Sequence, residues 1–445
     1  MKILIAGAGE VGSHLAKLLS NESQEVTLLD KDVDSLMVIE EKYNLMTAEG
    51  NPTSFASLKT AKAGAADLFI AVTTSETDNI VACSMAHKLG ARRTVARVDT
   101  YEYILPENDE YFQSLGIDQR IYPEYLAAQE IISAMRYPWA RNRFEIHDGE
   151  IVIVGVKIRE NAPVANMKLR DFGSAERSYN ISAIKRHNET IIPRGDDTIQ
   201  PDDILYFSTT ADKVDNLINL CGKAVNHIHD VIIMGGNKIA VQVAKEADPD
   251  EFSIKIIEKD QQRCEKLTEL CPDCQIVKGN GRDIEFLLEE GIEDTDAFIA
   301  LSNNSEANIL ACLTVKDYGV KKTIAEVENI QFVTEADNLN VGHVINKKLI
   351  ASSRIYQLLL DADVASAKCM SLADAEIAEI VVHEKARITR SQVKDLDISH
   401  DVTIAGLIRD GKGISVTGNT LVRAGDSVVV FYLNGAMRKV EKLFS

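Results

Sequence analysis

The chain opens with apolar runs that alternate with amphipathic stretches. Ile3–Ala6 is continuously apolar, and Val11, Leu15 and Leu18 follow at the spacing of one helix face. The alternation continues through further apolar runs and helical stretches: Val26–Leu29, Val33–Glu41, Asp67–Thr73, Ile80–Leu89 and Thr94–Val98. Continuous apolar runs are typical of strands buried in a parallel sheet. The pattern therefore predicts an α/β domain with a doubly wound, Rossmann-like parallel sheet.

The same pattern occurs a second time, which indicates an internal duplication. Gly7 and Asp30 match Gly235 and Glu258 at a constant offset of 228 residues. With one inserted residue, two further pairs match: Gly50-Asn51 with Gly279-Asn280, and Asn79-Ile80 with Asn308-Ile309. A duplicated nucleotide-binding unit is unusual for a simple dehydrogenase and suits a binding device that assembles into a symmetric ring.

A different pattern follows each copy and also occurs twice. It begins with strand-like runs at Ile151–Val156 and Ile377–Val382. Turn residues then recur at a constant offset of 223: Gly195, Ile199, Asp203 and Leu205 correspond to Gly418, Val422, Asp426 and Val428. Short β runs between such turns predict small α+β, β-rich modules. We expect Rossmann-like domains at residues 1–122 and 229–347, small modules at 140–225 and 368–445, and a hinge at Asn226–Asp230.

Two amphipathic helices are predicted where each Rossmann-like domain passes into its module. Tyr125–Met135 ends before Tyr137-Pro138, a pair that stops helices, and Leu349–Leu359 holds the same place in the second copy. Their apolar faces make both helices candidates for contacts between units.

The first copy carries a nucleotide-binding fingerprint. Gly7-Ala8-Gly9-Glu10-Val11-Gly12 is a complete GxGxxG between a strand and a helix. Gly7 permits the tight turn, Gly9 lets the backbone approach a pyrophosphate, and Gly12 allows close packing of helix and strand. Amides at the helix N-terminus then face the phosphates. Asp30 ends the second strand and suits hydrogen bonds to ribose hydroxyls, which favours NAD over NADP.

Further polar residues are expected at the carboxyl edge of the first sheet, where ligands bind. Thr73 and Thr74 end the fourth strand, and their hydroxyls can reach a phosphate or a ribose. Arg97 ends the fifth strand and can pair with phosphate.

The second copy departs from the fingerprint. Gly235 is kept, but Asn237 and Ala240 replace Gly9 and Gly12. The asparagine places a side chain where the pyrophosphate would approach, whereas Glu258 could still hold a ribose. Glu326 replaces Arg97, a reversal of charge. We therefore expect a weaker, altered or empty second site, formed by Gly235, Gly236, Asn237, Lys238, Ile239 and Glu258.

The composition limits the classes of molecule that the chain can bind directly. The chain has 445 residues, of which 45% are hydrophobic, and its net charge is −19. An acidic protein lacks the basic footprint that binds nucleic acid or anionic lipid. No apolar run approaches the roughly 20 residues that span a bilayer, and no signal peptide is expected because Met1-Lys2 leads straight into a strand. These features predict a cytoplasmic protein that reaches a membrane only through a protein partner.

Catalytic and metal-binding patterns are missing from the sequence. It contains no GxxxxGK[ST] loop and no conspicuous His–Asp pair or Ser or Cys nucleophile motif. The seven cysteines are scattered, and Cys271 and Cys274 form a lone CxxC without a second pair. We expect a binding protein without catalytic residues or a metal.

Together these motifs resemble the TrkA family, the tandem RCK (regulator of K⁺ conductance) subunits of Trk potassium-uptake systems. The resemblance rests on the fingerprint with Asp30, on the stretch TTSETDN from Thr73 to Asn79, on the strand that ends in Arg97, and on the repeated turns of the small modules. It covers essentially the whole chain. Asn51 stands where the family commonly has aspartate, and the second fingerprint is eroded.

The resemblance implies a peripheral regulatory subunit at the inner face of the cell membrane. Such a subunit assembles as a homotetramer beneath a membrane K⁺-translocating subunit of the TrkH/TrkG-like kind. Its conformation would respond to NAD(H), with ATP and ADP as further candidate ligands. The family's binding roles fall on Gly7–Val11, Asp30, Asn51, Thr73, Thr74 and Arg97, and in the second copy on Gly235–Ile239 and Glu258.

Three alternatives stay open from the sequence. The fingerprint also suits an NAD-dependent oxidoreductase, although the duplication and the missing catalytic groups argue against it. The chain could instead regulate a different cation transporter, such as an antiporter or a gated K⁺ channel. A third alternative is an NAD-sensing scaffold without a transporter.

Overall fold

The computed structural model describes residues 1–20, 24–43, 45–147, 149–171, 179–187, 189–363, 367–372, 375–433 and 435–444. The chain forms two compact units, and each takes segments from both halves of the sequence. The first unit contains residues 1–136 and 227–359, and the second contains residues 137–226 and 360–445. Equivalent domains therefore share a unit, although each is followed in sequence by a domain of the other kind.

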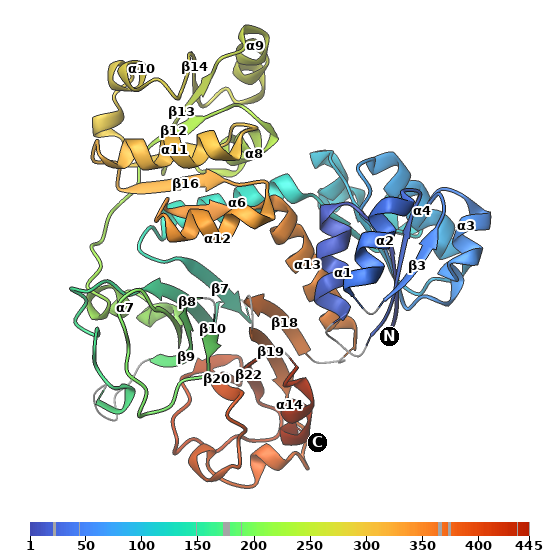
Figure 1. Ribbon diagram of the computed structural model, residues 1–445. Coiled ribbons are helices and arrows are strands. Elements are labelled where there is room, and N and C mark those ends of the chain that lie inside the picture. Colours follow the sequence, from blue (N-terminus) through green and yellow to red (C-terminus); the bar gives the residue numbers. More distant parts are fainter. Residues whose placement is uncertain are drawn as a thin grey trace. The chain divides into compact units, whose positions relative to one another are not determined.

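The first unit contains two parallel sheets with the same topology (Figure 1). Their strand orders are β3-β2-β1-β4-β5-β6 and β14-β13-β12-β15-β16-β17. The order in which strands are added to the sheet reverses between β1 and β4, and again between β12 and β15. Ligands bind at such a switch point. The strands of the first sheet are β1 (Lys2–Ala6), β2 (Glu25–Asp30), β3 (Met46–Glu49), β4 (Leu68–Ala71), β5 (Thr94–Arg97) and β6 (Gln119–Ile121). Those of the second are β12 (Asp230–Met234), β13 (Ser253–Glu258), β14 (Gln275–Lys278), β15 (Ala297–Ala300), β16 (Lys322–Glu326) and β17 (His343–Ile345).

Helices connect these strands in the order that the sequence predicts. Side-chain caps begin several of them: Ser75, for example, accepts a hydrogen bond from the Asp78 amide at the start of α4. The first domain contains α1 (Glu10–Ser20), α2 (Val33–Lys42), α3 (Phe55–Thr60), α4 (Glu76–Leu89), α5 (Asp109–Ser114) and α6 (Pro123–Arg136). The second contains α8 (Lys238–Glu246), α9 (Gln261–Leu270), α10 (Ile284–Glu289), α11 (Ser305–Lys316), α12 (Ile330–Asn338) and α13 (Lys347–Asp363). The predicted fold class of these domains, α/β with doubly wound parallel sheets, is confirmed.

The helices α6 and α13 are exchanged between the two Rossmann-like domains. The apolar face of α6 lies in the core of the second domain, where Ile131 packs in one cluster with Ile233 of β12 and Val243 of α8 (Figure 1). In return α13 lies on the first domain, where the Ser352 hydroxyl donates to the Val11 carbonyl at 3.5 Å. Each domain is thus completed by a helix that belongs to the other half of the chain. These are the two helices for which the sequence suggests contacts between units.

Polar contacts also join the two domains. The Tyr101 hydroxyl donates to Glu246 Oε1 of α8 at 2.6 Å, and this hydrogen bond raises the pKa of Tyr101 to about 12. Gln129 of α6 donates to the other oxygen of Glu246 at 3.1 Å. At the end of α6, Arg136 pairs with Glu251 at 2.9 Å. The pairing of the domains therefore combines an apolar helix face with a rim of hydrogen bonds.

The second unit contains two antiparallel five-stranded sheets that also share one topology, β10-β9-β11-β8-β7 and β18-β19-β22-β20-β21. Tyr206 and Phe431, from the two sheets, lie 6.0 Å apart between ring centroids in a shared apolar core. The elements of the first module are β7 (Asn142–Ile146), β8 (Ile151–Lys157), β9 (Tyr179–Arg186), β10 (Glu189–Ile191), β11 (Ile204–Thr209) and α7 (Asn216–Leu220). Those of the second are β18 (Ala367–Leu372), β19 (Ala375–Val381), β20 (Val402–Arg409), β21 (Lys412–Ile414), β22 (Ser427–Leu433) and α14 (Met437–Phe444). Small, β-rich α+β modules are thus present, as predicted.

An ion pair between an arginine and a buried aspartate recurs in the two modules. Arg186 donates from Nε and Nη2 to the two carboxylate oxygens of Asp203, each at 2.8 Å. Arg409 makes the equivalent pair with Asp426 at 2.8 and 2.7 Å. Burial alone would raise the pKa of Asp426, but hydrogen bonds from Arg409 and from the Arg423 amide outweigh it and hold that pKa below its ordinary value. The turn aspartates that the sequence singles out therefore anchor the ends of the strands.

Within the described residues, no helix combines the length and the apolar character that crossing a membrane requires.

Candidate nucleotide site and its second copy

The glycine-rich loop joins the end of β1 to α1. Gly7 has a φ of +115°, and a Cβ at this position would lie 2.9 Å from the Thr73 amide nitrogen. A Cβ on Gly12 would overlap the Gly7 carbonyl oxygen, whereas the space around Gly9 is open to 4 Å. Gly7 and Gly12 are therefore required by the local backbone packing, whereas Gly9 leaves room above the N-terminus of the helix. This open space is where the fingerprint places a pyrophosphate.

The Asp30 carboxylate lies beside this loop at the end of β2. The Ala8 amide donates to Asp30 Oδ2 at 2.5 Å, and the Asp32 amide donates to Oδ1 at 2.9 Å. A carboxylate has about four acceptor positions, so two backbone bonds leave capacity for ribose hydroxyls. Asn51 follows β3 and is exposed, and its Oδ1 accepts from the Thr53 amide and hydroxyl at 3.0 and 2.9 Å.

Asn79 organises the carboxyl ends of β4 and β5. Its fully buried amide accepts from the Thr73 amide at 2.9 Å and donates to the Arg97 carbonyl at 2.9 Å. Asn308 repeats this arrangement with Ser302 and the Glu326 carbonyl. The sequence signal for this role was the recurrence of Asn79 as Asn308, but the repeat alone did not reveal what the asparagine holds.

A cavity of about 220 Å³ opens at this edge. It brings together five of the predicted residues, namely Gly9, Glu10, Val11, Thr74 and Arg97, and Val72 also lines it. The other predicted residues do not line it: Gly7, Ala8, Gly12, Asp30, Asn51 and Thr73. Pro123 at the start of α6 and Lys347 and Lys348 at the start of α13 complete the wall. These three residues had no part in the sequence prediction, because the two helices reach the cavity only through the tertiary fold.

The cavity suits an anion. Arg97 pairs with Asp99 through Nη2 at 3.1 Å, while its buried Nε has no hydrogen-bond partner in the structure. An unpaired buried guanidinium nitrogen is costly unless a ligand accepts from it. Gly9, Glu10 and Val11, at the N-terminal end of α1, line the same space, and the N-terminal end of a helix favours negative charge. The residues present therefore fit the phosphates of a dinucleotide or an adenine nucleotide.

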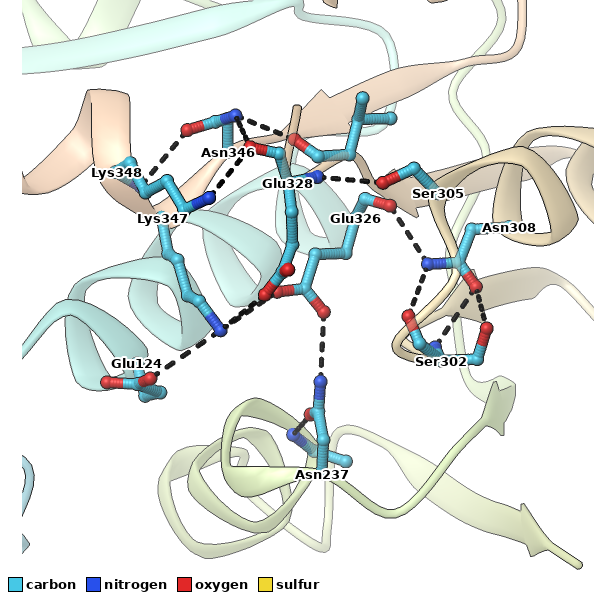
Figure 2. Close-up of polar contacts among 12 residues, drawn as sticks. Glu124, Asn237, Ser302, Ser305, Asn308, Glu326, Glu328, Asn346, Lys347 and Lys348 are labelled. Carbon is cyan, nitrogen blue, oxygen red and sulfur yellow. Dashed lines mark hydrogen bonds and ion pairs between the residues drawn. The ribbon is translucent and has the colours of Figure 1, made fainter. Parts of the chain in front are cut away.

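The second copy of the loop is closed by its own side chains. Asn237 caps α8, because its Oδ1 accepts from the Ala240 amide at 3.1 Å, and its Nδ2 donates to Glu326 Oε2 at 2.9 Å (Figure 2). Asn237 and Glu326, which replace Gly9 and Arg97 of the first copy, are thus joined by one hydrogen bond. Glu258 repeats the role of Asp30 and accepts from the Gly236 amide at 3.0 Å. Gly235 keeps its positive φ of +101°.

The remaining two residues of the predicted second site point elsewhere. Ile239 is fully buried in the core of its domain. Lys238 Nζ donates to the Asp99 carbonyl of the first domain at 3.1 Å.

Glu326 belongs to a partly buried group of charges around Lys347. Lys347 Nζ lies 3.0 Å from Glu328, 3.5 Å from Glu326 and 3.7 Å from Glu124 (Figure 2). Burial alone would lower the pKa of Lys347, but these carboxylates outweigh it and raise that pKa. Burial raises the pKa of Glu326, and Lys347 offsets part of that effect. The second site therefore presents carboxylates where the first presents Arg97.

Burial raises the pKa of several thiols among the residues that the structure describes. Burial raises the pKa of the Cys312 thiol to about 12 and that of Cys274 to about 11, which keeps both protonated at neutral pH. Burial also raises the pKa of Cys271. In the part of the chain that the structure describes, no group of three His, Cys, Asp or Glu side chains is placed to hold a metal ion.

Comparison with known proteins agrees with this architecture. The TrkA-N domain family matches residues 3–123 and 231–347, and the TrkA-C domain family matches residues 153–222 and 377–445. The Trk system potassium uptake protein TrkA of Haemophilus influenzae is 29% identical over 453 aligned residues, which cover 100% of this chain and 98% of that protein.

Two solved structures share the fold. The GsuK RCK domain has a TM-score of 0.63 and 16% identity, and the match covers 100% of this chain and 94% of that one. The GsuK channel bound to NAD has a TM-score of 0.62 and 16% identity, with 100% and 78% covered. With both domain families matched twice and in tandem order, the chain belongs to the TrkA family.

Proposed function

We propose that this chain is a cytoplasmic regulatory subunit, not an enzyme, that gates a membrane potassium-uptake system of the Trk type in response to a bound nucleotide. The observation that carries the proposal is the cationic cavity at the first glycine-rich loop, with the unpaired Nε of Arg97. Full-length relatives are named Trk system potassium uptake proteins, which supports the transport role.

In this proposal the first site holds NAD(H), ATP or ADP. The amides of Gly7–Gly12 face the pyrophosphate, Asp30 accepts from the ribose, and Thr74 and Arg97 contact the far part of the ligand. Thr73 and Asn51 shape the loops on either side. The second site binds no phosphate, because the Asn237–Glu326 hydrogen bond crosses the place where the phosphate would lie.

The partner is a membrane K⁺-translocating subunit, TrkH/TrkG-like, which holds the chain peripherally at the inner face of the membrane. The chain acts as a homotetramer, so that eight Rossmann-like domains form a ring. Ligands that bind two conformations of the ring with different affinity shift the gate, and a coupling free energy of about 1–3 kcal/mol at each site is ordinary for such a switch. Four equivalent sites together can then move an equilibrium that one site could not.

The direct test begins with calorimetric titration of NADH, NAD⁺, ATP and ADP into the full-length protein and its Asp30→Ala variant. We expect about one ligand per chain, with binding lost in the variant because the carboxylate both supports the loop and contacts the ribose. Binding of none of the four nucleotides, or equal affinity in Asp30→Ala, would remove the nucleotide switch from the proposal.

The transport half needs its own assay. The protein is added to proteoliposomes that contain the membrane K⁺-translocating subunit, and K⁺ flux is measured with and without nucleotide. The proposal expects a flux that depends on both the added chain and the nucleotide. Flux that ignores the chain, or oxidation of NADH in the presence of small substrates, would favour the other functional classes.

A further inference from the structure

We propose that Lys348, supplied by the second half of the chain, is a phosphate-binding residue of the nucleotide site in the first half. A terminal phosphate of the ligand replaces Glu10 as the ion-pair partner of Lys348, so that the charge of the ligand determines how strongly the ligand binds. This inference rests on the proposed binding of a nucleotide at the first site, and it names the residue that recognises the phosphates farthest from the ribose.

The position of Lys348 follows from the exchange of helices. The helix α13 is attached to the first domain along its length, through Ser352 to the Val11 carbonyl at 3.5 Å and through the Arg93 side chain to the Leu358 carbonyl at 3.4 Å. Its first two residues consequently reach the cavity above the glycine-rich loop. Asn346 caps this end, because its Oδ1 accepts from the Lys348 and Leu349 amides at 3.0 and 2.9 Å. The contacts of α13 with the first domain and the Asn346 cap therefore hold both lysines at the cavity.

The three cations that line the cavity, Arg97, Lys347 and Lys348, differ in the carboxylates that pair with them. Arg97 pairs with Asp99, Lys347 lies within 3.7 Å of three carboxylates, and Lys348 pairs with Glu10, the acidic residue among the lining residues. An ionised phosphate can replace the Glu10 carboxylate as the partner of Lys348, and a ligand with more phosphate charge replaces it more readily. A nicotinamide riboside group offers less to these cations, since its ribose and amide are uncharged. The cavity thus favours the terminal phosphates of ATP or ADP in the position where a dinucleotide would place its second nucleoside.

The two lysines differ in how firmly they are held. Lys347 is bound within 3.7 Å of three carboxylates, two of them buried. Lys348 has one carboxylate partner, Glu10 at 2.6 Å, and also donates to the Glu328 carbonyl at 3.3 Å. The Glu10 side chain is 57% exposed, so it can turn into water at little cost when a phosphate takes its place. Lys348 is therefore the lysine that can change partners.

The opposite junction of the two domains carries reversed charges. Lys238 stands at the position that corresponds to Glu10, and Glu124 stands at the position that corresponds to Lys348. Glu124 is buried and lies beside the second site in the carboxylate group around Lys347. The start of an exchanged helix thus brings a cation to the first site and an anion to the second. This asymmetry agrees with phosphate recognition at one site only.

The test compares nucleotides that differ in terminal charge, without divalent cations. Affinities for ATP, ADP and NADH are measured by calorimetry on the full chain and on Lys348→Ala, Glu10→Gln and Arg136→Ala. Arg136→Ala is the matched control, because it also removes a cation that forms an ion pair between the two domains, with Glu251, away from the cavity. For Lys348→Ala we expect the affinity for ATP to fall about tenfold, the size of one hydrogen bond between charged groups, and the affinity for NADH to fall less.

The direction in which Glu10→Gln changes the affinity for ATP separates the two explanations. Because Glu10 competes with the phosphate for Lys348, its neutralisation should strengthen ATP binding, about three- to tenfold, whereas damage to the domain contact would weaken it. The inference is overturned if Lys348→Ala binds ATP like Arg136→Ala, or if Glu10→Gln and Lys348→Ala both weaken it. In either case wild-type binding that Asp30→Ala abolishes leaves the proposed function standing. Absence of wild-type binding removes both.

Discussion

Replacing Asn237 with alanine should destabilise the second Rossmann-like domain. The change removes two interactions at once: the cap on the Ala240 amide at 3.1 Å and the donor to Glu326 at 2.9 Å. Loss of an N-cap costs about 1 kcal/mol. Loss of a hydrogen bond to a carboxylate that is 2% exposed costs about 1.5–3 kcal/mol, since the oxygen stays buried without that donor. The expected loss of stability is therefore about 2.5–4 kcal/mol.

A second variant separates the two contributions. Asn237→Ser keeps a side-chain oxygen for the cap but is too short to reach Glu326, so it should lose about 1.5–3 kcal/mol. In the double variant Asn237→Ala with Glu326→Ala, the unpaired carboxylate is gone and part of the stability should return. Lys347 still has Glu328 at 3.0 Å in that variant.

Hydrogen exchange of the buried amides in β12 and β15 is the suitable assay, because a chain of several domains does not unfold in one step. The expected loss corresponds to exchange that is roughly 60- to 700-fold faster in Asn237→Ala. Strands β8 and β11 of the other unit serve as the internal reference and should not change. Acceleration below about threefold, or equal acceleration in the alanine variant and the double variant, would refute the argument that the Asn237–Glu326 bond closes the second site.

Three further predictions concern other parts of the chain. Asp426→Asn should remove a pH dependence of stability in the second unit. Because the pKa of Asp426 is lowered in the folded state, its contribution to stability is fully present above about pH 4 and is lost as the pH falls through the folded-state pKa. Thermal unfolding at a series of pH values will detect this change. Combining Asn237→Gly with Glu326→Arg should restore a phosphate site, so calorimetric titration should rise from about one to about two nucleotides per chain; unchanged stoichiometry would show that the fold around Lys347 excludes the ligand by itself. Asn79→Ala should weaken nucleotide binding because it frees the backbone at the strand end beside the cavity. Asn308→Ala should destabilise the protein by a similar amount to Asn79→Ala, about 2–4 kcal/mol, without an effect on nucleotide binding. Equal losses of nucleotide affinity in the two variants would contradict separate roles for the two sites.

The sequence predicted what depends on local pattern. Parallel strands such as Ile3–Ala6 are continuously apolar, and both copies repeat the same spacing, so the two Rossmann-like domains were readable. The strands β3 and β6 were not predicted, because they are short and their residues are half-exposed or mixed in polarity. The pairing of like domains in each unit could not be read from the linear order of domains either.

The same limit applies to the sites. Asp30 and Arg97 are the last residues of parallel strands, so the sequence places both near one edge of the sheet. Lys348 lies 338 residues from Glu10, and nothing local connects them. Asp203 was noticed as a turn residue, whereas its partner Arg186 is 17 residues away on another strand. Contacts that depend on the tertiary fold remained hidden even where one of the two residues had been singled out.

The exchanged helices have a consequence for synthesis of the chain on the ribosome. The face of α6 is covered by β12, α8 and residues as far along as Ile345, about 200 residues after the helix itself has emerged. At roughly 5–20 residues per second, this apolar face waits about 10–40 s for its cover. During that interval the nascent first domain exposes an aggregation-prone surface that a chaperone or a neighbouring nascent chain could bind. Truncation before the second sheet should therefore yield an aggregation-prone fragment instead of an independent nucleotide-binding domain.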